Sequence, residues 1–222
     1  MKIIVLCETS NKVSQAFREK GHEVYSLDIE ANDVTQEYHI KTDLAEMLND
    51  RKEKWDGWWK QFDMVIAHPP CTYLCNSGVR WLYNKDGSKN YDRWGKMIDA
   101  LIFFNQIREL PVDKIVIENP IPHKHGIEFK YDQIIQPWQH GHGETKATCL
   151  WLKGVAPLVP SNIVEGRVGR MHNLPPSKER SKIRSETYQG IADAMADQWG
   201  QEDNYDPGWN IDVAQYRMEG DR

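Results

Sequence analysis

Residues 1–30, MKIIVLCETSNKVSQAFREKGHEVYSLDIE, decide the fold that this sequence predicts. The run Lys2–Cys7 is apolar and contains β-branched residues, which favours a strand, and a polar turn follows it. From Lys12 to Lys20 apolar side chains recur at helical spacing, and Gly21 ends the helix. His22–Ile29 alternates in polarity and predicts a second strand. This strand–helix–strand order predicts parallel strands joined by a helical crossover.

The rest of the chain continues the alternation of short apolar strands and helices. Further strands are predicted at Tyr38–Ile40, Asp63–Ala67, Lys114–Ile117 and Thr148–Leu152, and further helices at Arg93–Leu110 and Ile191–Trp199. We therefore predict an α/β fold, an open, doubly wound and mostly parallel sheet of the Rossmann-like kind. In such folds ligands bind in the crevice beyond the carboxyl ends of the strands.

Composition sets the class of protein that the sequence can encode. The chain has 222 residues, 40% of them hydrophobic and 27% charged, which suits one domain with a full core. No apolar run approaches the ~20 residues of a membrane span. The apolar run at the N-terminus is too short for a signal peptide. We expect no membrane association, a cytoplasmic location and reduced thiols at the four cysteines.

Changes in composition along the chain suggest its organisation. We expect a catalytic core over residues 1–153, a small basic insert over 154–187, a closing helix over 188–200 and a flexible acidic tail over 201–222. The net charge of −5 argues against binding nucleic acid mainly by bulk electrostatics. The insert nevertheless carries basic residues suited to phosphate contacts. They are Arg167, Arg170, Lys178, Arg180, Lys182 and Arg184.

A cysteine follows the strand at Asp63–Ala67, directly after two prolines. The prolines fix the backbone and remove two donors, so the chain leaves the sheet stiffly and presents Cys71 at the crevice. A structural thiol, a disulfide with Cys75, a metal site and a nucleophile are the readings to weigh. The C-x3-C spacing and the His-x-His pairs do not fit common zinc patterns, so we predict no metal.

Several stretches resemble motifs of the DNA cytosine-5 methyltransferase family, in the family's order. Residues 1–30 resemble its first cofactor motif, HPPCTYLCNSG its Pro-Pro-Cys motif and IVIENP its Glu-Asn motif. ETKATCLWL stands where the family has a basic strand motif, and YQGIADAMA resembles the closing motif. The chain is more closely similar to compact phage and prophage members. If it is phage-encoded, its location is the host cytoplasm.

The resemblance implies a role for each matching residue. Cys71 would be the nucleophile that adds to C6 of cytosine, and Glu118 would hold N3, with Lys146 and Thr148 beside them. S-adenosylmethionine would be the cofactor, and DNA the partner of a monomer or homodimer. The implied cofactor residues are Cys7, Glu8, Thr9, Asp28, Ile29, Asp43, Pro69, Gln189 and Ile191. Ser77 and Arg80 would contact nucleic acid, together with the basic residues of the insert.

Three departures from the family pattern keep other readings open. The first motif lacks its glycines, two arginines of the basic strand motif are replaced by Lys146 and Thr148, and the insert is short. The same chemistry on RNA or on a free pyrimidine nucleotide is one alternative. A binding module acting in phage–host conflict is another. A nucleophilic Cys71 also requires a lowered pKa, which we expect Lys146 or Arg80 to provide.

Overall fold

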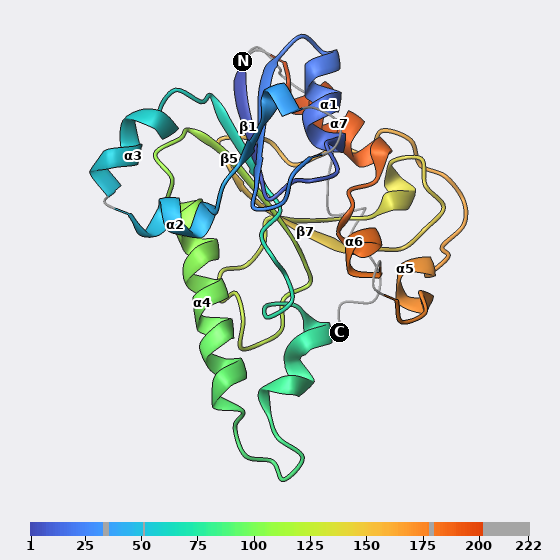
Figure 1. Ribbon diagram of the computed structural model, residues 1–222. Helices are drawn as coiled ribbons and strands as arrows, with labels where there is room; N and C mark the ends of the chain where they lie inside the picture. The colour runs from blue at the N-terminus through green and yellow to red at the C-terminus, as the bar shows by residue number, and fades with distance from the viewer. Residues whose placement is uncertain (33–35, 51, 178–179, 202–222) are drawn as a thin grey trace.

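The computed structural model describes residues 1–32, 36–50, 52–177 and 180–201. Its centre is a seven-stranded sheet in the order β3-β2-β1-β4-β5-β7-β6 (Figure 1). The strands are β1 Lys2–Leu6, β2 Glu23–Asp28, β3 His39–Lys41, β4 Met64–Ala67, β5 Lys114–Pro120, β6 Gln133–Ile135 and β7 Thr148–Lys153. The helices are α1 Lys12–Glu19, α2 Leu44–Asn49, α3 Lys52–Trp59, α4 Tyr91–Arg108, α5 Arg170–Asn173, α6 Arg180–Ser185 and α7 Gln189–Trp199. Short 3₁₀ helices occur at η1 Gln36–Tyr38, η2 Asn76–Leu82 and η3 Pro137–Gln139.

Five neighbouring strands of the sheet are parallel. β1 pairs in parallel with β2 and β4, β2 with β3, and β4 with β5. β7 lies between β5 and β6 and is antiparallel to both. A mostly parallel sheet with helices on both faces and one antiparallel strand inserted near its edge is a doubly wound α/β fold of the Rossmann-like kind. The predicted α/β fold class is confirmed.

Helices cover both faces of the sheet, and the alternation along β1 shows why. Ile3 and Val5 face a cluster that includes Phe17 of α1 and Met195 of α7. Ile4 and Leu6 face the opposite cluster, which contains residues of α2, α3 and α4. Successive side chains of a strand point to opposite faces, so a strand buried on both sides reads as a continuous apolar run. Figure 1 shows α1 and α7 side by side on one face.

Some elements escape the sequence prediction. α2, α3 and the three-residue strand β6 were not predicted, and α5 and α6 lie within the basic insert over 154–187, for which no helix was predicted. Each is short, and β6 forms because it pairs with the long strand β7. The expected acidic tail over 201–222 lies outside the described residues beyond position 201. Within the described ranges, no helix is both long enough and apolar enough to cross a membrane.

The first half of the expected insert runs back along the core. The Gln133 side chain makes two hydrogen bonds with the backbone of Leu158. It donates to the Leu158 carbonyl at 2.6 Å and accepts from the Leu158 amide at 2.7 Å. Bridges join His140 to Asn162 and Glu144 to Val168. The chain is therefore held against the region just before β7 until it reaches α5.

Candidate active site

The turn after β1 does without glycine by placing other residues in left-handed backbone conformations. Cys7 has φ 58° and Asn11 has φ 59°, a region in which Asn is enriched among non-glycine residues. Between them, the buried carboxylate of Glu8 accepts hydrogen bonds from the Val13 amide at 2.7 Å and the Ser14 amide at 3.3 Å. The Ser14 hydroxyl donates to the same carboxylate. A negative charge therefore already occupies the amino end of α1, where a dinucleotide's pyrophosphate would bind.

Two carboxylates and an exposed apolar side chain gather beyond the ends of β1 and β2. Burial, and then the charges of Asp28 and Asp43, raise the pKa of the Cys7 thiol, which places the three groups close together. Asp28 accepts from the Glu30 amide at 2.9 Å, and Asp43 caps α2 by accepting from the Ala45 amide at 2.8 Å. Ile29 beside them is 62% exposed. Carboxylates next to an apolar surface suit a ribose and a planar base.

The ends of β4 and β5 bring the predicted nucleophile and acid to the same edge. Because these strands are parallel neighbours, the Pro-Pro-Cys loop and Glu118 emerge side by side. Between them lies His68, whose Nδ1 is 3.0 Å from Glu118 Oε2 in a nearly buried pair. The hydroxyl of Thr187, which precedes α7, donates to the same carboxylate. Pro69 is buried at the end of β4.

β7 adds a cation to this edge. It runs antiparallel to β5 with Pro120 opposite Thr148, so the start of β7 lies where β5 ends. The Lys146 charge acts on both Glu118 and Cys71, as the pKa values of both groups reflect. Thr148 itself is buried, and its hydroxyl donates to the Lys146 carbonyl at 3.1 Å. Burial lowers the pKa of Lys146, and the charge of Glu118 opposes that effect.

The two cysteines of the loop form a thiol pair, which the sequence did not predict. The Cys71 thiol donates a hydrogen bond to the Cys75 sulfur, and this bond, followed by burial, raises the pKa of Cys71. The same bond, with one from Ser77, lowers the pKa of Cys75 to about 5. The expected low pKa of Cys71 is therefore wrong for the resting site. The hydrogen bond between the two thiols therefore favours the protonated form of Cys71 and the thiolate form of Cys75.

The His68–Glu118 pair makes stability depend on pH. Burial alone would lower the pKa of His68, but the hydrogen bond and charge of Glu118 outweigh it, so this pKa is raised. Burial alone would raise the pKa of Glu118, but His68 and then Lys146 outweigh it, so this pKa is lowered. The pair's full contribution is therefore present between about pH 4.3 and pH 6.5, the unfolded values. It is lost as pH rises through the folded pKa of His68 or falls through that of Glu118.

We expect the free energy of unfolding to decrease, on the order of 1 kcal/mol, as pH rises from 6 to 9 because of this pair. His68→Gln should flatten that dependence, measured by urea denaturation at both pH values. His125→Gln is the matched control, since the charged neighbours of His125 are Lys124 and Lys89. An equal flattening by both substitutions would contradict the assignment.

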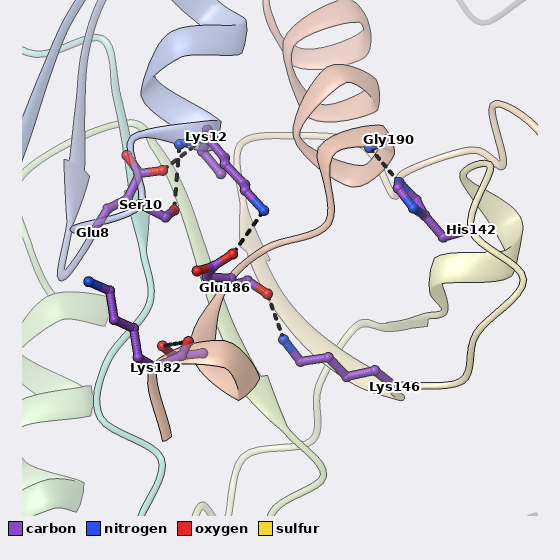
Figure 2. Close-up of polar contacts among 10 residues, drawn as sticks. Glu8, Ser10, Lys12, His142, Lys146, Lys182, Glu186 and Gly190 are labelled. Carbon is purple, nitrogen blue, oxygen red and sulfur yellow. Dashed lines mark hydrogen bonds and ion pairs between the residues drawn. The ribbon is translucent and has the colours of Figure 1, made fainter. Parts of the chain in front are cut away.

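A cavity of about 300 Å³ opens between α1 and the segment that leads into α7. Figure 2 shows Lys12 reaching from the start of α1 to Glu186, with Nζ and Oε2 3.0 Å apart. Lys146 donates to the Glu186 carbonyl, also at 3.0 Å, and His142 accepts from the Gly190 amide. The cavity therefore adjoins both the turn after β1 and the thiol–acid cluster.

The fold itself uses the side chains of some residues predicted to bind the cofactor. Glu8 caps α1, as described, and Ile191 is buried in the core cluster between the sheet and α1. Thr9 lies in the turn after β1, and Gln189 lines the cavity while donating to Asp193 at 2.8 Å. A direct contact with cofactor therefore remains a prediction for these positions, and the side chains of Glu8 and Ile191 have other partners.

The predicted nucleic-acid residues fall into two groups. Ser77 and Arg80 lie on η2, one turn beyond Cys71. Arg167 is exposed and stacks 3.9 Å from the Trp138 ring centroid, while Arg170 pairs with Glu144 at 3.0 Å. Arg180, Lys182 and Arg184 lie on α6, and Lys178 is outside the described residues. The charge of Arg184 acts on Lys146, which places α6 beside the thiol–acid cluster.

Sequence reasoning missed His68, Thr187, Lys12 and Glu186. His68 directly precedes Pro-Pro-Cys, and a titratable residue next to the predicted nucleophile could have indicated a residue of the site. Thr187 and Glu186 lie just before the closing motif, and no local pattern sets them apart. Among the described residues, no three His, Cys, Asp or Glu side chains converge as metal ligands would.

Several solved structures that are similar to this chain are described as methyltransferases. An E. coli prophage protein described as a DNA modification methyltransferase matches at 16% identity over 79% of this chain and 55% of its own, with TM-score 0.47. The Entamoeba histolytica methyltransferase EhMeth matches at 12% identity over 76% and 57%, with TM-score 0.48. A Spodoptera frugiperda DNMT2 variant matches at 14% identity over 75% and 54%, with TM-score 0.42.

This chain thus spans little more than half the length of these proteins. No protein-family model and no curated protein matches the sequence. The fold assignment rests on the strand order, and the site assignment rests on the contacts described above.

Proposed function

We propose that this protein transfers a methyl group from S-adenosylmethionine to C5 of cytosine in DNA. The observation that supports the proposal is the cluster at the ends of β4 and β5. It joins a thiol, Cys71, to a carboxyl group, Glu118, with the Lys146 cation acting on both. A module that only binds ligands has no chemical need for this combination.

The residues beyond β1 and β2 fit S-adenosylmethionine better than a dinucleotide. Glu8 already neutralises the amino end of α1, which disfavours a pyrophosphate there. Asp28 suits the ribose hydroxyls, Ile29 offers an apolar face to the adenine, and Asp43 suits the adenine amino group. When bound, the cofactor supplies an electrophilic methyl group.

The chain's own residues would make C5 of cytosine reactive. The Cys71 sulfur adds to C6 of the ring, forming a carbon–sulfur bond, and passes its proton to the Cys75 thiolate. Glu118 holds N3 and supplies the proton that the addition requires there. His68 and Thr187 orient the carboxyl group through their hydrogen bonds. After methylation a base removes the C5 proton and Cys71 is eliminated. In duplex DNA the base must be flipped out to reach this site.

Labelled S-adenosylmethionine offered with DNA, RNA or free dCMP tests the proposal. We expect label in DNA, at C5 of cytosine after digestion to nucleosides. Label in RNA or in dCMP alone would move the same chemistry to another acceptor and contradict the DNA assignment. Cofactor binding is measured separately by calorimetry, with Asp28→Asn expected to weaken it and Glu109→Gln, an exposed acid after α4, as control. Absence of both binding and transfer would favour a binding module.

A further inference from the structure

The loop between β4 and α4 projects away from the sheet, and together with the first turn of α4 it forms an arm of residues 76–94 (Figure 1). It begins with η2, one turn beyond Cys71, and turns back through a bridge between Tyr83 and Lys89. Gly87, at φ 85°, lies in its tip, where the Gly87 amide donates to the Asn84 carbonyl. The arm therefore starts beside the proposed nucleophile and extends outward from it.

Contacts at the base of the arm fix its position. Leu82 is buried, and its carbonyl accepts from the Asn90 amide at 2.9 Å and from Trp94 Nε1 at 3.0 Å. An Arg93 guanidinium nitrogen donates to the Thr72 carbonyl at 2.9 Å, which ties the arm to the residue after Cys71. Gly78 lies so close to the same carbonyl that a β-carbon would come within 2.5 Å of it.

Large aromatic side chains on the arm remain in contact with solvent. Trp81 is 54% exposed, Tyr83 42% and Tyr91 79%. Cations lie among them, with the Arg80 guanidinium 4.6 Å from the Trp81 ring centroid and Lys89 Nζ 4.9 Å from that of Trp94. Over residues 76–94 the chain has four cationic and two acidic residues, although its net charge is −5. The cationic residues are Arg80, Lys85, Lys89 and Arg93, and the acidic ones are Asp86 and Asp92.

Exposed aromatic rings interleaved with cations are the surface that unpaired nucleic acid binds. Bases stack on the rings and phosphates pair with the cations. A ring can stack on a base only where the face of that base is free, which a continuous duplex does not offer. The insert is small and the net charge of the chain is −5, which argues against holding a duplex mainly by bulk electrostatics.

We propose that the arm is a stacking surface for single-stranded DNA, with Trp81 and Tyr83 as its base platforms. The inference rests on the proposed function for the choice of DNA, and deepens it by making unpaired cytosine the acceptor. A DNA strand bound along the arm would extend to Cys71, since η2 at the base of the arm begins one turn beyond that residue. No base has to be flipped from a helix in this arrangement.

Fluorescence anisotropy with a labelled, mixed-sequence DNA of about 12 nucleotides tests the inference. The single strand should bind at least about tenfold more tightly than its duplex. Trp81→Ala should weaken that binding by about tenfold or more, the loss expected for one stacked base, and Trp81→Phe should restore most of it. Phe129→Ala is the matched control, because Phe129 is an exposed ring stacked with Arg108 outside the arm. Circular dichroism checks that each variant is folded.

Binding is measured on Cys71→Ser protein without cofactor, so that it does not depend on catalysis. Methyl transfer to duplex only, with tight duplex binding that Trp81→Ala leaves unchanged, would overturn the inference and leave the proposed function standing. Tight single-strand binding without methyl transfer to any acceptor would support the arm as a stacking surface and overturn the proposed function. Tighter binding of RNA of the same sequence would show that the arm's partner is RNA and not DNA.

Discussion

Replacing Cys71 by serine should abolish methyl transfer, lowering the rate by at least about a thousandfold. The substitution replaces one sulfur with oxygen and keeps the shape of the side chain. A serine hydroxyl is far less acidic than a thiol, and burial at this position already disfavours the anion. Transfer is measured with labelled S-adenosylmethionine. The covalent adduct is trapped on DNA containing 5-fluorocytosine, whose C5 carries no removable proton.

Cys75→Ser is the matched control, since it removes the neighbouring sulfur and leaves the proposed nucleophile. We expect this variant to form the trapped adduct, with the rate lowered by no more than about tenfold. Its rate should also rise at higher pH than that of the unmodified protein, because the low-pKa partner that accepts the Cys71 proton has been removed. Transfer that survives Cys71→Ser but is lost in Cys75→Ser would show that the two roles are reversed.

Most of the fold could be predicted from the sequence because its strands carry a strong local signal. β1 and β4 are buried on both faces and read as apolar runs, and α1 and α7 show helical periodicity. β6 gave no such signal, since its three residues are ordered by pairing with β7. The helix α3 contains three tryptophans and one glycine, none of which is a strong helix former, and packing of Trp59 stabilises it instead.

The candidate site was predictable where chemistry depends on single residues at strand ends. Cys71 and Glu118 were predicted in this way, whereas Lys146 was predicted from the family resemblance, and the antiparallel course of β7 brings the lysine to the other two. The contacts between side chains were not predictable. His68 and Glu118 are fifty positions apart in the sequence, and Thr187 reaches the carboxylate from another segment. Glu8 is a residue at a strand end whose predicted role differs from its contacts. It was expected to face the cofactor, but its carboxylate accepts hydrogen bonds at the start of α1.

Replacing Glu118 by glutamine should lower methyl transfer by about a hundredfold to a thousandfold, with little change in cofactor affinity. The amide has the size of the carboxyl group and can still donate a hydrogen bond to N3. It cannot hand a proton to N3 as the ring accepts the Cys71 sulfur, so addition at C6 becomes slow. Transfer is measured with labelled cofactor, and affinity by calorimetry on the same preparation.

His68→Gln separates the role of Glu118 as proton donor from the role of His68 in positioning it. In our proposal the His68 side chain contacts Glu118 and not the substrate. Glu118→Gln should lower the rate at every pH. His68→Gln keeps a hydrogen-bonding group but removes the charge that lowers the Glu118 pKa, so the carboxyl group should hold its proton to higher pH. The optimum of the pH–rate profile should therefore move in the alkaline direction, while the maximum rate falls by about tenfold at most.

Glu128→Gln, at an exposed acid between β5 and β6, should change neither quantity. A rate equal to that of the unmodified protein in Glu118→Gln would exclude this carboxyl group as the proton donor and leave Lys146, whose charge also acts on Cys71, as the group to test next.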